Sequence, residues 1–237
     1  MINQKKVPMP EDVATTTGQT DIFDPAKVAA IYDSSAEAYS QDRSALDLFN
    51  NDNQLDQLQA LIPPPARVMD LGCGEGYIPE RLMSRGYEVT GVEISSGMIK
   101  KAIERVPGAD FLHASMLDVD FADGSFGLVV SFYAIWHLII EDQIIMFERV
   151  FKYLKPGGYF YFTLMSSELI KEAHPEMNEP ERYSGPYNFA GTVYPYAHIP
   201  HAEYLEKLSA IGFVDSSIDW IKTGVESMPW VLARKPL

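Results

Sequence analysis

The sequence is poor in cysteine and in positive charge. Its 237 residues include one cysteine, Cys73, which excludes an internal disulfide and a metal cluster built on several cysteines, and makes a reducing cytoplasm the expected location. Lysine and arginine number 19 against 33 aspartate and glutamate residues, so the formal net charge is -14. Proteins that grip nucleic acid or anionic lipid usually carry a basic surface, so we expect neither as a partner.

Long hydrophobic runs and an export signal are also missing. The longest stretch without a charged residue, Gly124 to Ile140, is shorter than a usual transmembrane helix and contains Ser131 and His137, so we predict a buried strand followed by a loop. Residues 1–20 have a basic start but no apolar segment behind it, which predicts a disordered leader rather than a signal peptide.

The chain does contain a regular alternation of strand and helix signals between residues 66 and 164. Short apolar runs predict five strands, and the stretches between them are predicted to be helices. Repeated strand, helix, strand units predict an α/β, doubly wound, mostly parallel sheet with helices on both faces, which binds ligands at the carboxyl ends of its strands. The predicted strands are Arg67–Leu71, Tyr87–Glu93, Asp110–His113, Leu128–Phe132 and Tyr159–Leu164.

The residues before and after this alternating region predict further helices, strands and an insertion. Helices are expected over residues 24–43, with Asp24 as N-cap, and over residues 45–61. Residues 165–200 are rich in proline and too long for an ordinary crossover, and a helix over 202–211 and strands near 214–221 and 230–234 follow. The predicted organisation is a leader (1–20), an N-terminal helical cap (21–62), a core (63–164), a substrate lid (165–200) and a C-terminal helix with two strands that complete the core (201–237).

The strongest motif, Asp70-Leu71-Gly72-Cys73-Gly74-Glu75-Gly76, follows the first predicted strand and opens a helix. Alternate glycines let the backbone pass close to a ligand and leave helix N-terminal amides pointing at it. The Gly-x-Gly-x-Gly spacing differs from the Gly-x-Gly-x-x-Gly of dinucleotide sites, which disfavours a nicotinamide oxidoreductase. A carboxylate two residues before the first glycine would repel a pyrophosphate but suits a ligand with an ammonium group.

Two further motifs follow in order. Glu93 ends the second predicted strand about 20 residues after the glycines, a position that suits a ribose diol, and Lys155-Pro156-Gly157-Gly158 forms a turn before the fifth. Together the three motifs resemble the class I S-adenosylmethionine-dependent methyltransferases. The resemblance covers roughly residues 66–164. It implies a Rossmann-like methyltransferase fold with seven strands, S-adenosylmethionine as cofactor and S-adenosylhomocysteine as product.

The resemblance also implies a set of cofactor contacts. Where the family often has an aspartate that binds adenine, this chain has Ala114-Ser115-Met116, so either Ser115 or, in another register, Asp118 takes that role. Tyr32, Tyr39 and Arg43 match a region that folds over the cofactor in several relatives, and Tyr32 and Tyr39 share one face of this N-terminal helix. Cys73 is expected to pack as a small residue rather than react. The implied cofactor-binding residues are Asp70, Gly72, Cys73, Gly74, Glu93, Ile94, Met98, Ser115, Met116, Ser131, Phe132, Tyr39 and Arg43.

His137 is the candidate catalytic residue because it follows the fourth strand, which the resemblance places near the transferred methyl group. A neutral imidazole can remove a proton near pH 7, although a histidine here can instead only orient the backbone. Aromatic residues concentrate in the proline-rich insertion, where they can wall an acceptor or pack on one another. The candidate substrate residues are Tyr133, Trp136, Tyr183, Tyr187, Tyr194 and Tyr196. No metal is expected, because His198 and His201 lack a cysteine or carboxylate partner.

The function that these features favour is methyl transfer to an O, N or C nucleophile of a small molecule, with a neutral or basic acceptor preferred because the chain is acidic. One alternative is a peptide or carrier-bound substrate. Another is a protein of this fold that binds the cofactor without transferring a methyl group. The choice of nucleophile and the oligomeric state stay open.

Overall fold

The computed structural model describes residues 19–45, 52–175, 177, 182–189, 191–223 and 226–237. Its centre is a seven-stranded sheet with the order β3-β2-β1-β4-β5-β9-β8, in which β1 to β5 are parallel and β9 runs antiparallel to both neighbours. This arrangement confirms the predicted doubly wound, mostly parallel sheet. The strands are β1 (Arg67–Leu71), β2 (Glu88–Glu93), β3 (Asp110–His113), β4 (Phe126–Ser131), β5 (Leu154–Thr163), β8 (Val214–Thr223) and β9 (Glu226–Arg234).

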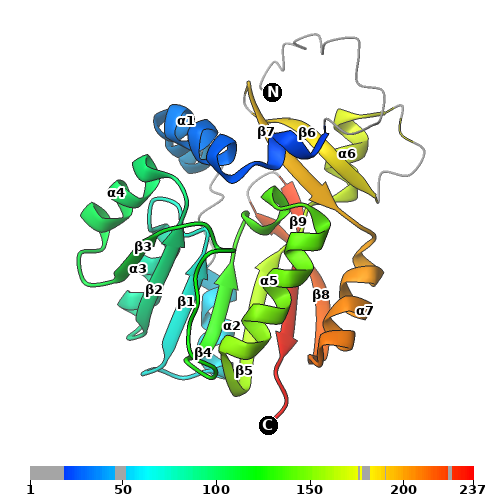
Figure 1. Ribbon diagram of the computed structural model, residues 1–237. Helices are drawn as coiled ribbons and strands as arrows, with labels where there is room; N and C mark the ends of the chain where they lie inside the picture. Colours follow the sequence, from blue (N-terminus) through cyan, green and yellow to red (C-terminus); the bar gives the residue numbers. More distant parts are fainter. Residues whose placement is uncertain (1–18, 46–51, 176, 178–181, 190, 224–225) are drawn as a thin grey trace.

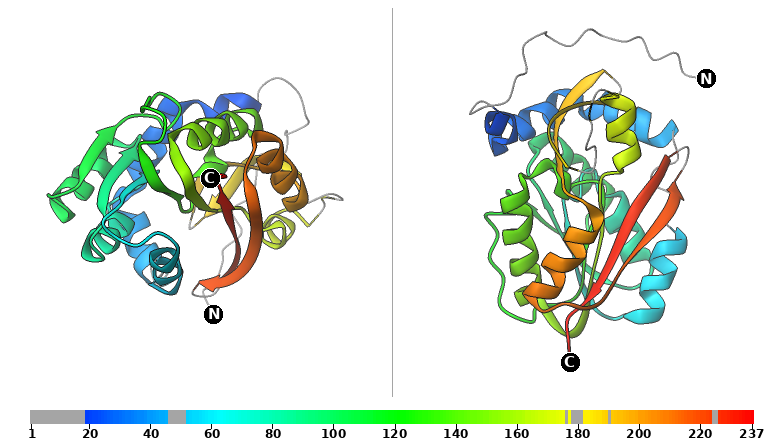
Figure 2. Two further views of the ribbon diagram at one scale, coloured as in Figure 1. Left: turned by 90° about the horizontal axis from the view of Figure 1, so that it is seen from below. Right: turned by 90° about the vertical axis from the view of Figure 1, so that its right-hand side faces the viewer.

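Helices cover both faces of the sheet (Figure 2). Alternate residues of β1 enter two separate cores, because successive side chains of a strand point to opposite faces. Val68 lies in the core that contains Leu55 of α2 (Asp52–Leu61) and Leu82 of α3 (Tyr77–Ser84). Met69 lies in the core that contains Phe147 of α5 (Ile140–Tyr153) and Leu208 of α7 (His201–Ile211). The sheet is therefore buried between two helical layers.

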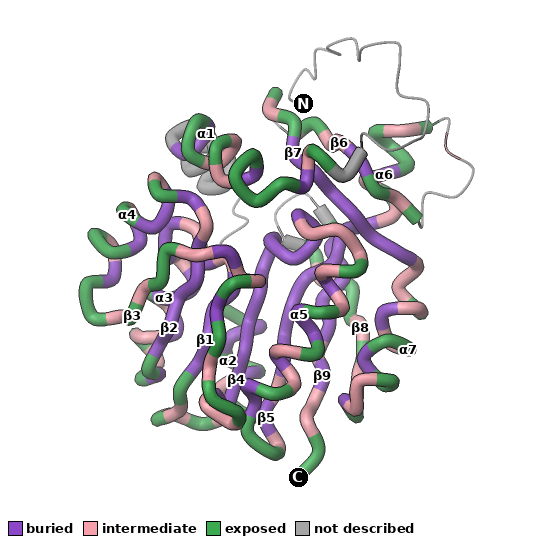
Figure 3. Tube along the Cα trace, in the orientation of Figure 1, coloured by how far each residue is buried: buried purple, intermediate pink, exposed green. Residues whose placement is uncertain are grey.

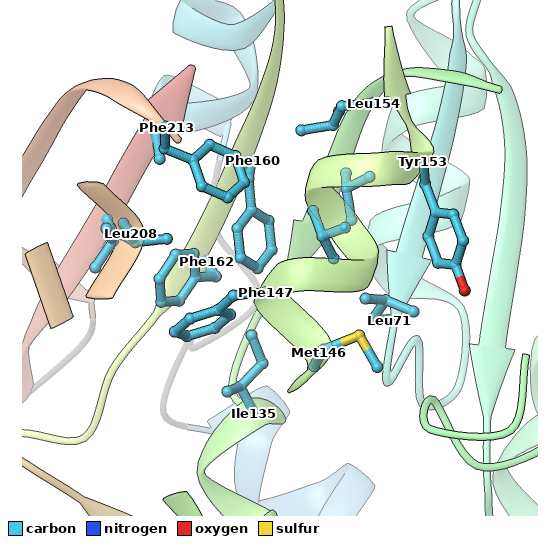
Figure 4. Packing of buried hydrophobic residues seen from close by; sticks show 14 of the residues in the cluster. Leu71, Ile135, Met146, Phe147, Tyr153, Leu154, Phe160, Phe162, Leu208 and Phe213 are labelled. Atoms are coloured by element: carbon cyan, nitrogen blue, oxygen red, sulfur yellow. The ribbon is translucent and has the colours of Figure 1, made fainter. Parts of the chain in front are cut away.

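The core on the α5 face contains a cluster of packed phenylalanine rings. Phe160 and Phe162 of β5 stack with their ring centroids 4.3 Å apart, and Phe147 of α5 packs 5.0 Å from Phe162 (Figure 4). All three side chains are fully buried. Burying a side chain of this size contributes about 1.5–3 kcal/mol, so this cluster anchors α5 against the strand that precedes the proline-rich insertion.

One predicted helix does not form. Residues 114–125, between β3 and β4, contain no helix, which corrects the expectation that every interstrand stretch would be helical. Three aspartates and a glycine lie in this stretch, and both residue types favour turns over helix interiors. Its backbone is held by α5 instead, because Arg149 donates to the carbonyl of Leu117 and the Tyr153 hydroxyl donates to that of Val119 (2.9 Å).

The Lys-Pro-Gly-Gly turn is an irregularity inside β5 rather than a turn before it. Leu154 pairs with Phe126, but the next pair joins Tyr159 to Leu128, so the register shifts between them. Gly157 at the irregularity has φ 76°, a conformation that glycine adopts without strain. The backbone amide of Gly157 donates to the carbonyls of Lys235 and Pro236, so the turn also holds the end of β9.

Two segments outside the sheet meet at the carboxyl ends of the parallel strands (Figure 1). One is the N-terminal pair of η1 (Gln19–Phe23) and α1 (Pro25–Ala45), which begins at Asp24, whose Oδ1 accepts from the amides of Ala26 (2.9 Å) and Lys27 (3.2 Å). The other follows β5 and contains α6 (Ser167–Ala173) and the antiparallel hairpin of β6 (Tyr183–Phe189) and β7 (Thr192–His198). Residues 194–198 of β7 are buried (Figure 3). These two segments cover the end of the sheet where a ligand is expected.

Other boundaries agree with the sequence within a few residues where the structure describes them. Of the predicted second helix, residues 52–61 form α2, while residues 46–51 lie outside the described part. The predicted leader lies almost wholly outside it as well. Gly212 ends α7 with φ 116°, a left-handed conformation that glycine adopts without strain. Within the described residues, none of the helices combines the length and apolarity needed to cross a membrane.

Candidate active site

One cavity opens at the carboxyl ends of β1, β2 and β4, beneath α1. It holds about 1080 Å³ of space that protein atoms do not fill, its open mouth included, which is ample for a cofactor and a small second molecule. Twelve of the predicted site residues line it. They are Asp70, Gly72, Cys73, Gly74, Glu93, Ile94, Met98, Ser115, Met116, Phe132, Tyr133 and His137.

The glycine-rich loop is held against the end of β2. The amides of Gly72 and Cys73 both donate to the carbonyl of Val92, at 2.8 and 3.0 Å. Gly72 has φ 75°, and a Cβ atom there would lie 2.4 Å from the Cβ of Ala134, in the loop after β4. Gly74 has φ 53°, and a Cβ atom there would meet nothing within 4 Å. The loop therefore touches the loop after β4 at Gly72 and faces open space at Gly74.

Glu93, the last residue of β2, has a buried carboxylate that two backbone amides fix in place. Its Oε2 accepts from the Gly74 amide (2.9 Å) and its Oε1 accepts from the Ser95 amide (2.8 Å). Burial raises the pKa of Glu93, and the backbone hydrogen bonds oppose that shift. Each oxygen keeps a lone pair that a ligand hydroxyl can use.

Asp70 presents a second buried carboxyl group beside Glu93. It is 2% exposed, and no donor among the described residues reaches its Oδ2. Burial, together with the charge of Glu93, raises the pKa of Asp70 to about 8. An unpaired buried acceptor is costly, so this atom calls for a ligand that brings a donor or a positive charge.

The residues predicted to contact adenine lie along one side of the cavity. Met98 and Ile94 line it, and Met98 is held at the start of α4 (Ser96–Arg105) by a bond from its amide to Ser95 Oγ (3.1 Å). Of the two alternatives for the adenine hydrogen bond, Ser115 lines the cavity and Asp118 does not. Ser115 Oγ accepts from the Leu117 amide at 3.2 Å.

Ser131 does not line the cavity. Its hydroxyl is fully buried and donates to the carbonyl of Leu71 (2.7 Å), so it joins the ends of β1 and β4. Cys73 lines the cavity, but burial raises the pKa of its thiol well above the ordinary value, which suits the predicted packing role better than a reactive one.

His137 ends the short helix η2 (Ile135–His137) and reaches the cavity from the loop after β4. Its Nδ1 lies 2.8 Å from the carbonyl oxygen of Pro195, and its Nε2 lies 2.6 Å from the hydroxyl of Tyr32. A carbonyl can only accept, so Nδ1 carries the proton of the neutral ring and Nε2 accepts from Tyr32. This tautomer leaves the basic nitrogen on the α1 side, bound to a residue that itself lines the cavity.

Tyr133 lines the cavity from a strained backbone position. Its φ is 60°, unusual for a bulky residue, and its amide donates to the Thr163 hydroxyl at 2.7 Å. Trp136 does not reach the cavity: it is 3% exposed and packs edge-on against Tyr133, with ring centroids 5.8 Å apart.

The tyrosines of the β6–β7 hairpin do not line the cavity, and three of them, Tyr187, Tyr194 and Tyr196, form a layer behind His137. The Tyr196 ring centroid lies 5.0 Å from that of His137, and Tyr187 stacks on Tyr196 at 4.7 Å. Tyr194 lies 5.2 Å from Tyr32, while Tyr183 bonds to His174 at 3.0 Å. In this arrangement the hairpin supports His137 and α1 instead of touching the cavity directly.

The N-terminal segment supplies cavity residues beyond the predicted site residues, and one of them, Tyr32, lies in the region that the resemblance places over the cofactor. Phe23, Val28 and Tyr32 line the cavity, and Val28 and Tyr32 are four positions apart on one face of α1. That spacing was available in the sequence, but it does not say which partner the face meets. The predicted residues Tyr39 and Arg43 belong to α1, and their side chains lie outside the described part of the structure.

Comparison with known proteins identifies the central part of the chain. Residues 69–162 match the family model for the methyltransferase domain. The malonyl-[acyl-carrier protein] O-methyltransferase of Enterobacter lignolyticus (strain SCF1) is 28% identical over 152 residues, which are 63% of this chain and 57% of that protein. The phosphoethanolamine N-methyltransferase of Plasmodium falciparum (isolate 3D7) is 33% identical over 105 residues, which are 41% of this chain and 38% of that protein. The chain spans about half the length of the curated relatives it matches.

Solved structures agree on the fold. Magnesium protoporphyrin IX methyltransferase from Synechocystis PCC 6803, solved with S-adenosylmethionine bound, superimposes with a TM-score of 0.68 at 15% identity. The match covers 93% of this chain and 100% of that one. Because it covers 93% of the chain, it extends beyond residues 69–162, which the family model matches.

Proposed function

We propose that this chain, a class I S-adenosylmethionine-dependent methyltransferase by its domain and fold, moves the methyl group of S-adenosylmethionine to an O, N or C nucleophile of a small molecule. The observation that carries the proposal is the pairing of two buried carboxyl groups, Asp70 and Glu93, at neighbouring strand ends around one cavity. The glycine-rich loop lies between them.

The residues present fit this cofactor. Asp70 Oδ2 lacks a donor among the described residues and would receive the ammonium group of the methionine part. Glu93, already fixed by two amides, would accept the ribose hydroxyls. Met98 and Ile94 offer apolar contact to adenine. When bound, the cofactor supplies an electrophilic methyl group on a sulfonium sulfur.

The chain's own contribution to transfer is alignment and proton removal. Tyr32 and His137 form a hydrogen-bonded pair on the cavity wall. The Tyr32 hydroxyl can pass its proton to His137 Nε2 as it takes one from an acceptor hydroxyl or ammonium group, which leaves the imidazolium bound through Nδ1–H to the Pro195 carbonyl. Acceptors without such a proton would use the pair only for orientation.

The walls favour a neutral or basic acceptor. Among the described residues that line the cavity there is no lysine or arginine, while Asp70, Glu93 and Glu75 are acidic. Phe23, Phe132 and other apolar side chains also line it, and apolar walls reduce the access of water to the reacting atoms. An acceptor with a phosphate or carboxylate near the reacting atom would meet no lysine or arginine among these lining residues.

A carrier-bound acceptor is the second candidate, and the malonyl-[acyl-carrier protein] relative is the observation that favours it. We retain the small molecule because α1 and the loop after β4 enclose the reacting side of the cavity. A role in binding the cofactor without transfer is the third. We further propose a cytoplasmic enzyme without a nucleic-acid or membrane partner, and regard residues 165–200 as its substrate lid.

Titration calorimetry with S-adenosylhomocysteine tests the proposal. We expect binding by the wild-type protein, and weaker binding by at least about 1 kcal/mol for both Asp70→Ala and Glu93→Ala, because each loses a hydrogen bond to the ligand. The absence of binding would refute the proposal. Incubation with methyl-labelled S-adenosylmethionine and fractions of a cell extract then separates the candidates: label in small molecules supports the first, label in protein the second, and no label the third.

A further inference from the structure

Three neighbouring residues of α1 hold three different parts of the molecule. Tyr32 bonds to His137, and the Ser35 hydroxyl lies 3.1 Å from that of Tyr194 in β7. Asp33, between them, reaches away from the hairpin to the beginning of α4. Because Tyr32 lines the cavity, the position of α1 determines the shape of the wall opposite the glycine-rich loop.

Asp33 binds the amino end of α4 through three donors. Its Oδ1 accepts from Ser95 Oγ at 2.6 Å and from the Gly97 amide at 2.8 Å, and its Oδ2 accepts from Ser96 Oγ at 3.1 Å. The hydrogen bond from Ser95, followed by that from Gly97, lowers the pKa of Asp33, so the group is an anion at neutral pH. A negative charge is favoured at a helix N-terminus, so this contact holds α1 to α4.

The same serine also orders the cofactor end of the cavity. The Ser95 amide donates to Glu93 Oε1 (2.8 Å), and Ser95 Oγ accepts from the Met98 amide (3.1 Å). Ser95 is fully buried, so these bonds are shielded from water. A continuous chain of hydrogen bonds thus runs from Glu93 through Ser95 to Asp33.

A second contact joins the same two helices one turn further along. Lys101 Nζ, on α4, donates to the carbonyl of Ala36 on α1 at 3.4 Å and lies 4.0 Å from the carboxylate of Glu75. Glu75 belongs to the glycine-rich loop and lines the cavity. The Asp33 contact and the Lys101 contact are therefore each connected to a residue that lines the cavity, Glu93 and Glu75 respectively.

We propose that Asp33 is a positioning residue that couples occupancy of the cofactor end of the cavity to the docking of α1. A ligand held by Glu93 stabilises the Ser95 loop, the loop holds Asp33, and Asp33 keeps α1 where Tyr32 meets His137. The inference rests on the proposed function, because the ligand is S-adenosylhomocysteine or its methylated form. By linkage, the ligand that orders α1 must also bind more weakly when α1 is released.

Hydrogen exchange of the α1 amides, with and without S-adenosylhomocysteine, tests the coupling. In the wild-type protein we expect the ligand to slow exchange along α1. In Asp33→Ala we expect most of that slowing to disappear and the affinity for S-adenosylhomocysteine to fall about fivefold or more. Asp33→Asn, which keeps the side-chain shape and loses the charge, should show the same changes to a smaller extent and replaces the alanine variant if that one does not fold.

Two control variants separate coupling from helix stability. Asp24→Ala removes the two bonds that begin α1 but no contact with α4. It should speed exchange in the first turn and leave the ligand-dependent slowing in the rest of the helix. Ser34→Ala removes only an exposed bond to the Ile31 carbonyl and should behave as wild type.

Each other outcome has one meaning. If Asp33→Ala speeds exchange equally with and without ligand and binds S-adenosylhomocysteine like the wild type, Asp33 has only a structural role and the proposal is overturned. If the wild type binds the ligand with no slowing in α1, the coupling is overturned while the proposed function stands. If the wild type does not bind the ligand, both are overturned.

Discussion

The cofactor end and the acceptor end of the cavity are formed by different chemical groups. At the cofactor end, backbone amides and two carboxyl groups lie at the ends of β1 and β2, where the parallel register of the strands sets them side by side. At the acceptor end, aromatic and imidazole side chains come from α1, from the loop after β4 and, behind them, from β7. We infer that the first end is fixed by the sheet and the second by contacts between inserted segments. Changes that leave the Asp33 contact of α1 intact should therefore affect a different step at each end.

The largest expected effect is at the acceptor end. His137→Ala should lower kcat by about two to four orders of magnitude for an acceptor that must lose a proton, because it removes the base of the Tyr32–His137 pair. The affinity for S-adenosylhomocysteine should stay within about twofold. Transfer of labelled methyl to an identified acceptor and calorimetry measure the two quantities.

Tyr32→Phe is the matched variant, because it removes the hydroxyl of the pair and keeps the ring against Tyr194. A similar loss of kcat in both variants would support a proton path through Tyr32. If His137→Ala instead weakens ligand binding and leaves kcat intact, the separation between the two ends fails.

The next effect is on folding at the cofactor end. Gly72→Ala should lower the free energy of unfolding by about 2–4 kcal/mol, because the residue has φ 75° and its Cβ would lie 2.4 Å from that of Ala134. Gly191→Ala is the control: its φ is 85° but a Cβ there meets nothing within 4 Å, so the cost should be only about 1–2 kcal/mol. Urea denaturation compares them, and equal costs would mean that the contact with Ala134 does not matter.

We expect the Asp70 carboxyl group to lower the stability of the ligand-free protein while it increases the affinity for the ligand. In the folded protein Asp70 keeps its proton up to a pKa of about 8, whereas in the unfolded chain it ionises near pH 4, so the folded state binds more protons between these values. Stability therefore falls as pH rises from about 4 to 8. Asp70→Asn should raise the free energy of unfolding of the ligand-free protein by about 1–3 kcal/mol at pH 8, and by less at pH 5.

The measurement is urea denaturation at the two pH values, with S-adenosylhomocysteine titration at pH 8 as the second readout. Asp70→Asn should bind the ligand more weakly than the wild type while being the more stable protein. A variant that is less stable than the wild type at pH 8 would contradict the burial cost assigned to this carboxyl group.

The smallest effect concerns the hairpin. Tyr194→Phe loses a bond to Ser35, but Ser35 keeps its bond to the Ile31 carbonyl at 2.7 Å, so the loss should be about 0.5–1.5 kcal/mol in unfolding free energy. Ligand affinity should not change measurably. A larger change in ligand affinity than in stability would show that the hairpin acts on the cofactor end directly.

Sequence reasoning succeeded where function depends on local pattern. The end of β1, its glycines and Glu93 at the end of β2 could be placed because strand register follows from hydrophobic runs. The adenine side was left open between Ser115 and Asp118, because this chain has Ala114-Ser115-Met116 where the family often has an aspartate, and two registers were possible. The mostly parallel, seven-stranded sheet followed from the family resemblance and was confirmed.

It was less informative where function depends on pairs of distant residues. Tyr32 and His137 are 105 positions apart, and no local pattern indicates that they meet. The hairpin tyrosines were expected at the substrate. In the structure, Tyr194 and Tyr196 of β7 pack on His137, and Tyr187 of β6 stacks on Tyr196. The aromatic content of the insertion predicted that it would lie near the site. It did not predict whether its tyrosines would line the cavity or pack behind His137.

The contacts of α1 with His137, Tyr194 and the start of α4 restrict where residues can be inserted into or deleted from this helix. Successive helical residues are about 100° apart, so inserting or deleting one residue within the stretch from Tyr32 to Ser35 would turn at least one of its side chains away from its partner. Insertions before Asp24 leave these directions intact. We therefore expect related sequences to vary in the number of residues ahead of α1 while keeping an unbroken spacing among these few positions.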